Sequence, residues 1–314
     1  MRAVVVRAPL RVALGGGGTD LPSYYREHGG LVVSTAIDKY VHMTVSTRFQ
    51  ERFLLKHLEW EEVDDARDVA HPILRAALTH HWDGGPVELA SVGDAPPGTG
   101  LGSSGTYTVC AIKALARLAG RDLEPGELAE AACHLEIDVI GRSIGKQDQY
   151  AAAYGGVRAY RFDPGGAVET RELQISDRMR AALCDRFLLF YTGQKRSASD
   201  ILGAGQAEEA LHRLKELAAE TCAALEADDL ERVAELMHEH WDAKRRRAPG
   251  TVTEEMDALR ERALGAGAGG VISLGAGGGG FLLVYSPDPE RTRAALGMAD
   301  LAFGLDDQGC TALT

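Results

Sequence analysis

The spacing of apolar and polar positions changes several times along the chain, and each change predicts a new element. Alternation with many β-branched residues over 31–48 predicts strands. Residues 3–14 predict either a strand pair or one bent strand. Further strands are predicted over 87–92, 154–162, 186–192 and 281–285. Helical spacing predicts helices over 66–83, 125–140 and 206–247, so both element types recur along the chain.

One stretch between a predicted strand and a predicted helix is rich in glycine. Residues 96–106 read Pro-Pro-Gly-Thr-Gly-Leu-Gly-Ser-Ser-Gly-Thr, and an apolar run at helical spacing follows. We therefore expect a helix to begin near Ser103 or Ser104. Glycines before a helix N-terminus let backbone N–H groups approach an anion, and the helix dipole favours negative charge there. The stretch predicts a phosphate-binding loop, although the residues alone also allow a flexible loop with a serine N-cap.

Two common nucleotide-binding patterns do not fit the sequence. A Walker loop ends in Gly-Lys-Ser or Gly-Lys-Thr, and residues 96–106 contain no lysine. A second glycine run, 15–18, follows the first predicted strand, as it does in dinucleotide-binding folds. That fingerprint needs its glycines to open a helix, whereas Thr-Asp-Leu-Pro follows here at 19–22. We therefore do not expect a dinucleotide-dependent oxidoreductase.

Composition excludes further classes of function. The chain has 314 residues, enough for two domains or one large one. Its net charge of -12 argues against a general binder of nucleic acid or of anionic membranes. Five scattered cysteines without a Cys-x-x-Cys pair predict free thiols in a reducing compartment. No signal peptide and no apolar stretch of about 18 residues is recognisable, so we expect a cytoplasmic location.

Residues 96–104 resemble the central motif of the GHMP kinases, the family of galactokinase, homoserine kinase, mevalonate kinase and phosphomevalonate kinase. Residues 8–20 and 275–283 resemble the first and third motifs of that family, in the same order. The resemblance implies an α+β fold with the active site in a cleft between two domains. The N-terminal domain, 1–175, would resemble domain 2 of ribosomal protein S5, and the C-terminal domain, 176–314, would be ferredoxin-like.

The resemblance also implies that ATP and Mg²⁺ are used. Glu136 and Asp148 match a family Glu that binds Mg²⁺ and an Asp that contacts the acceptor hydroxyl as a base or an orienting group. Ser104 would be the second Mg²⁺ ligand, and Arg11 would stabilise charge near the acceptor oxygen. Phosphoryl transfer needs such groups, although Glu136 alone could be a solvated helix residue and Asp148 a loop cap. The residues implied to bind ATP are Pro97, Gly98, Gly100, Leu101, Gly102, Ser103, Ser104, Gly105 and Thr106.

Residues 16–22 and 34–40 resemble the family branch that phosphorylates D-glycero-D-manno-heptose 7-phosphate. The implied reaction transfers phosphate to the anomeric hydroxyl and gives the 1,7-bisphosphate. Asp20 matches the position that binds sugar hydroxyls, although a Thr-Asp pair is also compatible with a turn or an N-cap. One position departs from the pattern, because Ile272 stands where these kinases carry a lysine. The residues implied to bind the sugar phosphate are Gly17, Thr19, Asp20, Lys39, Arg196 and Gly277, and the candidates for its distal phosphate are Arg142, Lys195, Arg196 and Lys244.

Two other functions stay open at this point. The first is another sugar 1-kinase of the family, galactokinase-like, that acts on an unphosphorylated hexose or heptose. The second is a sensor or regulator on the same scaffold that binds ATP and sugar without turnover. We expect a small-molecule sugar phosphate as the only kind of partner, with neither nucleic acid nor membrane, and a monomer or a homodimer.

Overall fold

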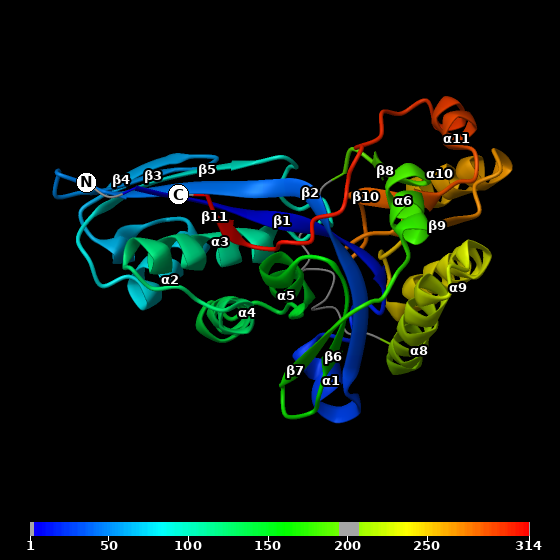
Figure 1. Cartoon of the computed structure of the whole chain (residues 1–314), viewed down its shortest axis with the longest axis horizontal. Coiled ribbons are helices and arrows are strands. Elements are labelled where there is room, and N and C mark those ends of the chain that lie inside the picture. The colour runs from blue at the N-terminus through cyan, green and yellow to red at the C-terminus, as the bar shows by residue number, and fades with distance from the viewer. Residues whose placement is uncertain (1–2, 195–206, 314) are drawn as a thin grey trace.

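The computed structural model describes residues 3–194 and 207–313. Its elements up to residue 172 form a long sheet with helices against it (Figure 1). The strands are β1 (Ala3–Gly15), β2 (Gly30–Thr47), β3 (Phe53–Lys56), β4 (Trp60–Val63), β5 (Val87–Gly93), β6 (Val157–Phe162) and β7 (Val168–Glu172). The helices are α1 (Pro22–His28), the 3₁₀ turn η1 (Ala66–Asp68), α2 (Pro72–His81), α3 (Ser103–Leu118), α4 (Pro125–Cys133), the π-helix η2 (His134–Val139) and α5 (Gln147–Tyr154).

The elements between Asp177 and Leu296 form a smaller sheet with its own helices, drawn on the right of Figure 1. The strands are β8 (Phe187–Tyr191), β9 (Gly270–Ser273) and β10 (Phe281–Tyr285), followed by the short strand β11 (Thr311–Ala312). The helices are α6 (Asp177–Asp185), α8 (Glu208–Glu226), α9 (Leu230–Arg247), α10 (Glu254–Gly265) and α11 (Pro289–Leu296). Among the described residues, none of these helices is both long enough and apolar enough to cross a membrane.

Strand β2 organises the larger sheet, whose order is β11-β1-β2-β5-β3-β4. Its first part, 30–35, pairs with β6, and its last part, 41–47, pairs with β5, while β1 runs antiparallel along its length. The register of β1 shifts at Pro9, which cannot donate a ladder hydrogen bond, and again before Gly15. The bent strand predicted over 3–14 is thus confirmed, and it carries its C-terminal end toward the smaller sheet (Figure 1).

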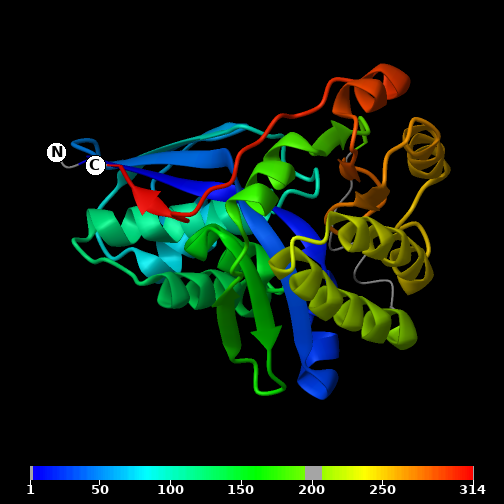
Figure 2. The ribbon, with the colours of Figure 1, turned by 45° about the vertical axis from the view of Figure 1, so that its right-hand side comes forward.

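The smaller sheet has the order β8-β10-β9, with both neighbours antiparallel. An isolated bridge between Phe190 and Asp300 lies on the outer edge of β8. Helices α8 and α9 pack side by side, and α9 covers β9 (Figure 2). The chain then returns, since β11 pairs with β1 in the larger sheet, next to the N-terminus. The larger sheet therefore contains a strand from each side of the predicted domain boundary at 175/176. That boundary stays a prediction.

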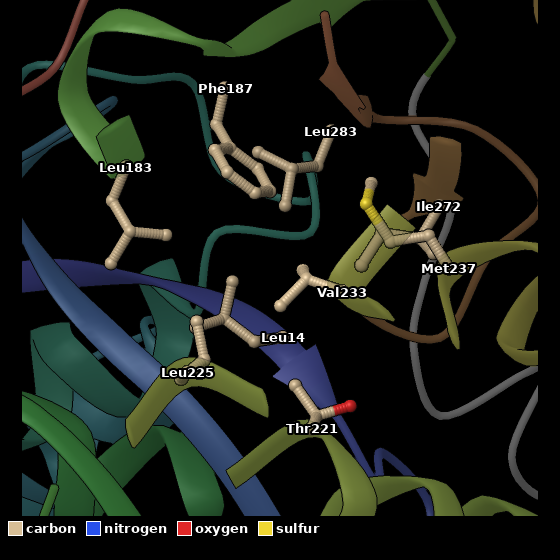
Figure 3. A pocket seen from close by; sticks show the side chains of 9 residues that line it. All are labelled: Leu14, Leu183, Phe187, Thr221, Leu225, Val233, Met237, Ile272 and Leu283. Carbon is tan, nitrogen blue, oxygen red and sulfur yellow. The ribbon is translucent and has the colours of Figure 1, made fainter. Parts of the chain in front are cut away.

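The end of β1 packs against an apolar core of the smaller part (Figure 3). Leu14 and eight side chains from elements after residue 176 surround a cavity of only about 10 Å³, which is room for at most about one water molecule. Ile272 is one of these side chains and is 1% exposed, so the position of the expected lysine points into this core. The lining residues are Leu14, Leu183, Phe187, Thr221, Leu225, Val233, Met237, Ile272 and Leu283.

Local chemistry explains where the predicted helices differ from the observed ones. The helix predicted over 66–83 begins at Pro72, because His71 caps it by accepting the N–H of Leu74, and 66–68 form only a 3₁₀ turn. The helix predicted over 206–247 divides at Asp228, whose φ of 58° lies in the left-handed region. The predicted free thiols are confirmed, since all five cysteines are unpaired.

Candidate active site

A cleft of about 930 Å³ is lined by residues from both parts of the chain. We call one group of its lining residues the Tyr107 side; it comprises His71, Ile73, Ser91, Val92 and Tyr107. We call a second group the Arg247 side; it comprises Gly17, Gly18, Asp20, Arg247, Ala276 and Gly277. The glycine-rich loop 96–105, Arg11 and Asp148 also line the cleft. A cleft of this size has room for a nucleotide together with a small second substrate.

The loop 96–105 is built for close approach of backbone to an anion. Gly98, Gly100 and Gly102 have φ of 76°, 86° and 80°, a region that other residues avoid. Gly102 is the N-cap of the sixteen-residue helix α3, so the free N–H groups of its first turn face the cleft. The hydroxyl of Ser103 is buried in that turn and has no hydrogen-bond partner in the protein. The predicted helix start near Ser103 or Ser104 is confirmed, since α3 begins at Ser103. This start has the chemistry of a phosphate site.

The second glycine-rich run, 274–280, supports the loop from behind. A Cβ on Gly100 would lie 2.8 Å from the carbonyl oxygen of Leu274, and one on Gly275 would lie 2.7 Å from the Cα of Gly100. The N–H of Phe281 donates to the carbonyl of Thr99 at 2.9 Å. Only glycine permits two backbones to pack this closely. The two glycine-rich runs therefore form one continuous part of the cleft lining.

Arg11 and Asp148 form an ion pair beside this loop. The guanidinium donates from Nε at 2.8 Å and from Nη2 at 2.5 Å to Oδ1 of Asp148, and from Nη1 at 2.5 Å to the carbonyl of Gly100. Arg11 is 3% exposed, whereas the Asp148 side chain is 28% exposed. The carboxylate is therefore held by a buried cation, and its second oxygen remains available to the cleft.

A close contact between α3 and α5 positions this carboxylate. Asp148 lies in the first turn of α5, and a Cβ on Gly105 of α3 would come within 2.7 Å of the Asp148 Cβ. A side chain at 105 would push α5 away from the loop. The motif glycine thus sets the distance from Asp148 to the phosphate-binding loop.

Glu136 lies beneath the loop rather than on the cleft surface. It is fully buried, and its Oε2 accepts from Ser104 Oγ at 2.8 Å and from Arg142 Nη1 at 2.8 Å. Its Oε1 accepts from Gln149 Nε2 at 2.9 Å. The π-helical turn 134–139 widens the backbone here and directs the carboxylate to α3.

The Ser104 and Glu136 oxygens fit a magnesium site. Two neighbouring ligands of an octahedral Mg²⁺ at 2.0–2.1 Å lie about 2.9 Å apart, close to the observed separation of 2.8 Å. Nη1 of Arg142 donates to both oxygens, so a positive charge already lies against the pair. The cation would be held by oxygens only, which is the donor set that Mg²⁺ prefers.

Asp20 is the buried carboxylate of the Arg247 side. It is 2% exposed, its Oδ1 accepts from the N–H of Gly18 at 3.0 Å, and its Oδ2 accepts from the N–H of Gln147 at 3.1 Å. Burial raises the pKa of Asp20, and the nearby Asp148 charge adds to the effect. Because Gln147 directly precedes Asp148, this carboxylate also ties the 17–21 loop to the start of α5.

Two buried basic residues lie at the end of α9, and one of them, Arg247, lines the cleft. Arg247 is 2% exposed, donates to the carbonyls of Gly17 at 3.0 Å and Ala276 at 2.8 Å, and has no partner for its Nε. Lys244 donates to the carbonyls of Ser273 at 2.5 Å and Gly275 at 2.8 Å and does not line the cleft. Burial lowers the pKa of Arg247 to about 10 and that of Lys244 well below its usual range.

The Tyr107 side is mostly uncharged. Burial lowers the pKa of His71 to about 4, so its imidazole is neutral at pH 7. Its Nδ1 accepts the N–H of Leu74, so the proton of the neutral ring is on Nε2. The His71 and Tyr107 rings lie 5.2 Å apart. This surface suits a flat, weakly polar group better than a charged one.

The structure brings most of the predicted contact residues together. Those that line the cleft are Arg11, Gly17, Asp20, Pro97, Gly98, Gly100, Gly102, Ser103, Ser104, Gly105, Asp148 and Gly277. Leu101, Thr19 and Thr106 are buried behind it; the Thr106 hydroxyl donates to the carbonyl of Pro9 and the Thr19 hydroxyl to that of Gly16. Lys39 does not line the cleft and instead pairs with Asp38. Lys195 and Arg196 lie outside the described residues.

Sequence reasoning missed Arg247. It ends a run of four basic residues, 244–247, which is typical of a solvated helix face. The apolar positions of α9 already contained the opposite signal, because Met237, Trp241, Lys244 and Arg247 follow one another at helical spacing on its buried face. When two basic residues occupy the next positions of an apolar helix face, they are expected to be buried and to have specific hydrogen-bond partners.

Comparisons with known proteins agree with the motifs. Models of the GHMP kinase N-terminal and C-terminal domains match residues 69–156 and 221–299, together more than half of the chain. The D-glycero-alpha-D-manno-heptose 7-phosphate kinase of Campylobacter jejuni is 29% identical to this chain, over 93% of this chain and 91% of its own length.

Solved structures give the same result. A D-glycero-D-manno-heptose 1-phosphate kinase from Bacteroides thetaiotaomicron superposes with a TM-score of 0.82 at 25% identity, covering 99% of both chains. The Lactococcus lactis galactokinase, at 18% identity and a TM-score of 0.77, covers 99% of this chain and 95% of its own and shares the fold. With both domain models matched and all three motifs in place, the chain belongs to the GHMP kinase family.

Proposed function

We propose that this protein transfers the γ-phosphoryl group of ATP to the anomeric hydroxyl of D-glycero-D-manno-heptose 7-phosphate and so forms the 1,7-bisphosphate. The observation that supports this most is the contact set of Arg11, which holds Asp148 with two hydrogen bonds and the phosphate-binding loop with a third. A carboxylate is thereby fixed beside the place where the transferred group would lie. In-line phosphoryl transfer depends on this kind of positioning.

The loop and the Tyr107 side would bind ATP. The N–H groups of the first α3 turn, with the free hydroxyl of Ser103, would contact the phosphates, and the neutral surface at His71 and Tyr107 would contact the base. Ser104 and Glu136 would hold Mg²⁺, which would neutralise phosphate oxygens when bound. Arg142 would move away from these two oxygens as the cation binds.

Asp148 and the Arg247 side would bind the acceptor. Asp148 would orient the acceptor hydroxyl and take up its proton, while Arg11 keeps the carboxylate in place. Asp20 would accept hydrogen bonds from sugar hydroxyls. Arg247, with an unpartnered Nε, is the described cation best placed to contact the distal phosphate of the sugar.

The acceptor assignment rests on the relatives. The Campylobacter relative is named a heptose 7-phosphate kinase, and the Bacteroides structure a heptose 1-phosphate kinase. Both names give a phosphorylated heptose but differ in the position of its phosphate. We further propose a domain boundary near 175, a cytoplasmic location, and a monomer or homodimer.

The test is a set of turnover assays that measure ADP release with ATP, Mg²⁺ and one acceptor at a time. The acceptors are heptose 7-phosphate, heptose 1-phosphate, the free heptose, mannose and galactose. We expect kcat/KM to be highest for heptose 7-phosphate by at least about tenfold. Turnover only with a free sugar would contradict the acceptor while leaving the kinase assignment intact, and no turnover with any sugar would contradict both.

A further inference from the structure

Three potential metal ligands meet on the surface, away from the cleft residues. His28, at the end of α1, and His212, on α8, both direct Nε2 to the Oε1 of Glu208 in the first turn of α8. The separations are 3.2 Å for His28 and 3.3 Å for His212. One ligand atom from each of the three residues lies within 4.8 Å of the others. The cluster joins α1, the helix that follows the 17–21 loop, to α8 of the C-terminal part.

We propose that His28, Glu208 and His212 form a binding site for a single Zn²⁺ ion. Neighbouring ligands of a tetrahedral Zn²⁺ with bonds of 2.0–2.1 Å lie about 3.3–3.4 Å apart. Both nitrogen-to-oxygen separations are close to this value, and they lie at or beyond the long end of N–H···O hydrogen bonds. Two imidazoles with one carboxylate form a common Zn²⁺ donor set and a poor one for Mg²⁺.

A hydrogen bond behind one ligand fixes its orientation. The Tyr24 hydroxyl lies 2.7 Å from Nδ1 of His212 and is buried under α8. An Nδ1–H that donates to this oxygen leaves Nε2 without a proton and facing the Glu208 oxygen. Zinc-binding histidines typically carry such a partner on the other ring nitrogen. Tyr24 is thus a positioning residue of the site.

The second histidine is held by its helix. Lys215 of α8 donates to the carbonyl of His28, so α1 and α8 are already tied at this point. The His28 and His212 rings meet edge to face with centroids 4.8 Å apart. Their side chains are 28% and 44% exposed, so Zn²⁺ can enter from solvent and water can take the fourth position. Bound Zn²⁺ would fasten α1 to α8.

Zn²⁺ binding by the full-length chain tests this proposal independently of kinase activity. Protein stripped with a chelator is titrated with Zn²⁺ in competition with a chromogenic chelator, in the presence of millimolar Mg²⁺. We expect one site per chain, weakened at least tenfold in His28→Gln and in His212→Gln. We expect Tyr24→Phe, which keeps the ring, to weaken it by about tenfold. X-ray absorption should show two imidazole nitrogens among the ligands.

A matched control is available on the surface of the larger part. His134 faces Asp138 at 2.9 Å with both side chains more than half exposed, so His134→Gln removes a histidine–carboxylate pair that lacks a second histidine. This variant should bind Zn²⁺ like the parent chain. The proposal is overturned if the parent has no saturable site, or if His28→Gln and His212→Gln bind within twofold of the parent. Metal-free melting temperatures of all variants check that they are folded.

Discussion

The two sides of the cleft recognise their ligands by different means. Around the 96–105 loop the groups next to the cleft are backbone N–H groups, which glycines with positive φ leave accessible, and the buried hydroxyl of Ser103, which has no partner in the protein. On the Arg247 side they are buried side chains: Asp20 accepts from the N–H groups of Gly18 and Gln147, and Arg247 donates to the carbonyls of Gly17 and Ala276. Backbone groups can bind any phosphate chain, whereas buried side-chain charges select a ligand of matching shape and charge. We therefore expect variants of the loop to affect the nucleotide and variants of the Arg247 side to affect the sugar.

The largest effect is expected where the two sides meet. Asp148→Asn keeps the size of the side chain and an oxygen that accepts from Arg11, but removes the base. We expect kcat to fall by about 10²- to 10⁴-fold while both substrates still bind. Steady-state kinetics with binding of a non-hydrolysable ATP analogue measures both quantities. A kcat within a few-fold of the parent would contradict the role of Asp148.

The next effect concerns the glycines of the loop. Gly100→Ala introduces a Cβ at a φ of 86° and 2.8 Å from the carbonyl oxygen of Leu274, so it has to displace the loop. Gly141→Ala is the matched control, since Gly141 has a φ of 77° but no atom within 4 Å of a built Cβ. We expect about 1–2 kcal/mol of destabilisation in the control, from strain alone.

In Gly100→Ala we expect a larger loss of unfolding free energy and at least tenfold weaker ATP-analogue binding, because the anion-binding N–H groups move with the loop. Chemical denaturation and calorimetry measure the two quantities. Equal effects of the two alanines would show that the packing of the two glycine runs has no part in nucleotide binding.

A smaller and more selective effect is expected on the Arg247 side. Arg247→Met removes the charge but keeps a side chain of similar length. Arg246→Met is the control, because Arg246 is the neighbouring arginine and is exposed. We expect KM for the sugar phosphate to rise about 10- to 100-fold, as for the loss of a charge-assisted hydrogen bond, with KM for ATP within twofold. A rise in the KM for ATP instead would break the distinction between the two sides.

The smallest effect concerns pH and stability. Burial raises the pKa of Asp20 above its unfolded value, so the folded state binds the proton more tightly. This contribution to stability is complete below the unfolded pKa and is lost as pH rises through the folded pKa. Asp20→Asn has no carboxyl group to titrate at this position. The stability of the variant relative to that of the parent should therefore increase as pH rises from about 4 to 7, because only the parent loses the contribution of Asp20. Urea denaturation across this range measures the slope, and a slope of opposite sign would contradict it.

The sequence predicted the backbone-built side of the cleft far better than the charged side. The glycines at 98, 100 and 102 and the serines after them form a local signal, because turn geometry and helix start are encoded within a few residues. Arg11 and Asp148 are 137 positions apart, and only the resemblance to the family placed both near the acceptor oxygen. Their ion pair was not predicted. The only sequence signal for Arg247 was its helical spacing from the apolar residues of α9. The run of basic residues around it instead favoured a solvated helix face, which is wrong for Arg247.

Elements without local signals were also missed. Helix α5 begins at Gln147 after a Lys146 N-cap that makes no side-chain cap hydrogen bond, so no capping residue marks its start. Its position is set by contact with Gly105 of α3, which no local pattern contains. Ile272 is a position where the sequence suggested a functional difference that the structure does not support. The absence of the expected lysine drew attention to it, but its side chain points into an apolar core made mostly by the smaller part.

The most direct test of the account is the phosphorus NMR spectrum of the product formed from ATP and D-glycero-D-manno-heptose 7-phosphate. The account predicts a new phosphate resonance coupled to the anomeric proton, together with the retained 7-phosphate resonance, and no such product with Asp148→Asn. ATP consumption without an anomeric phosphate, or an unchanged product yield from Asp148→Asn, would contradict it.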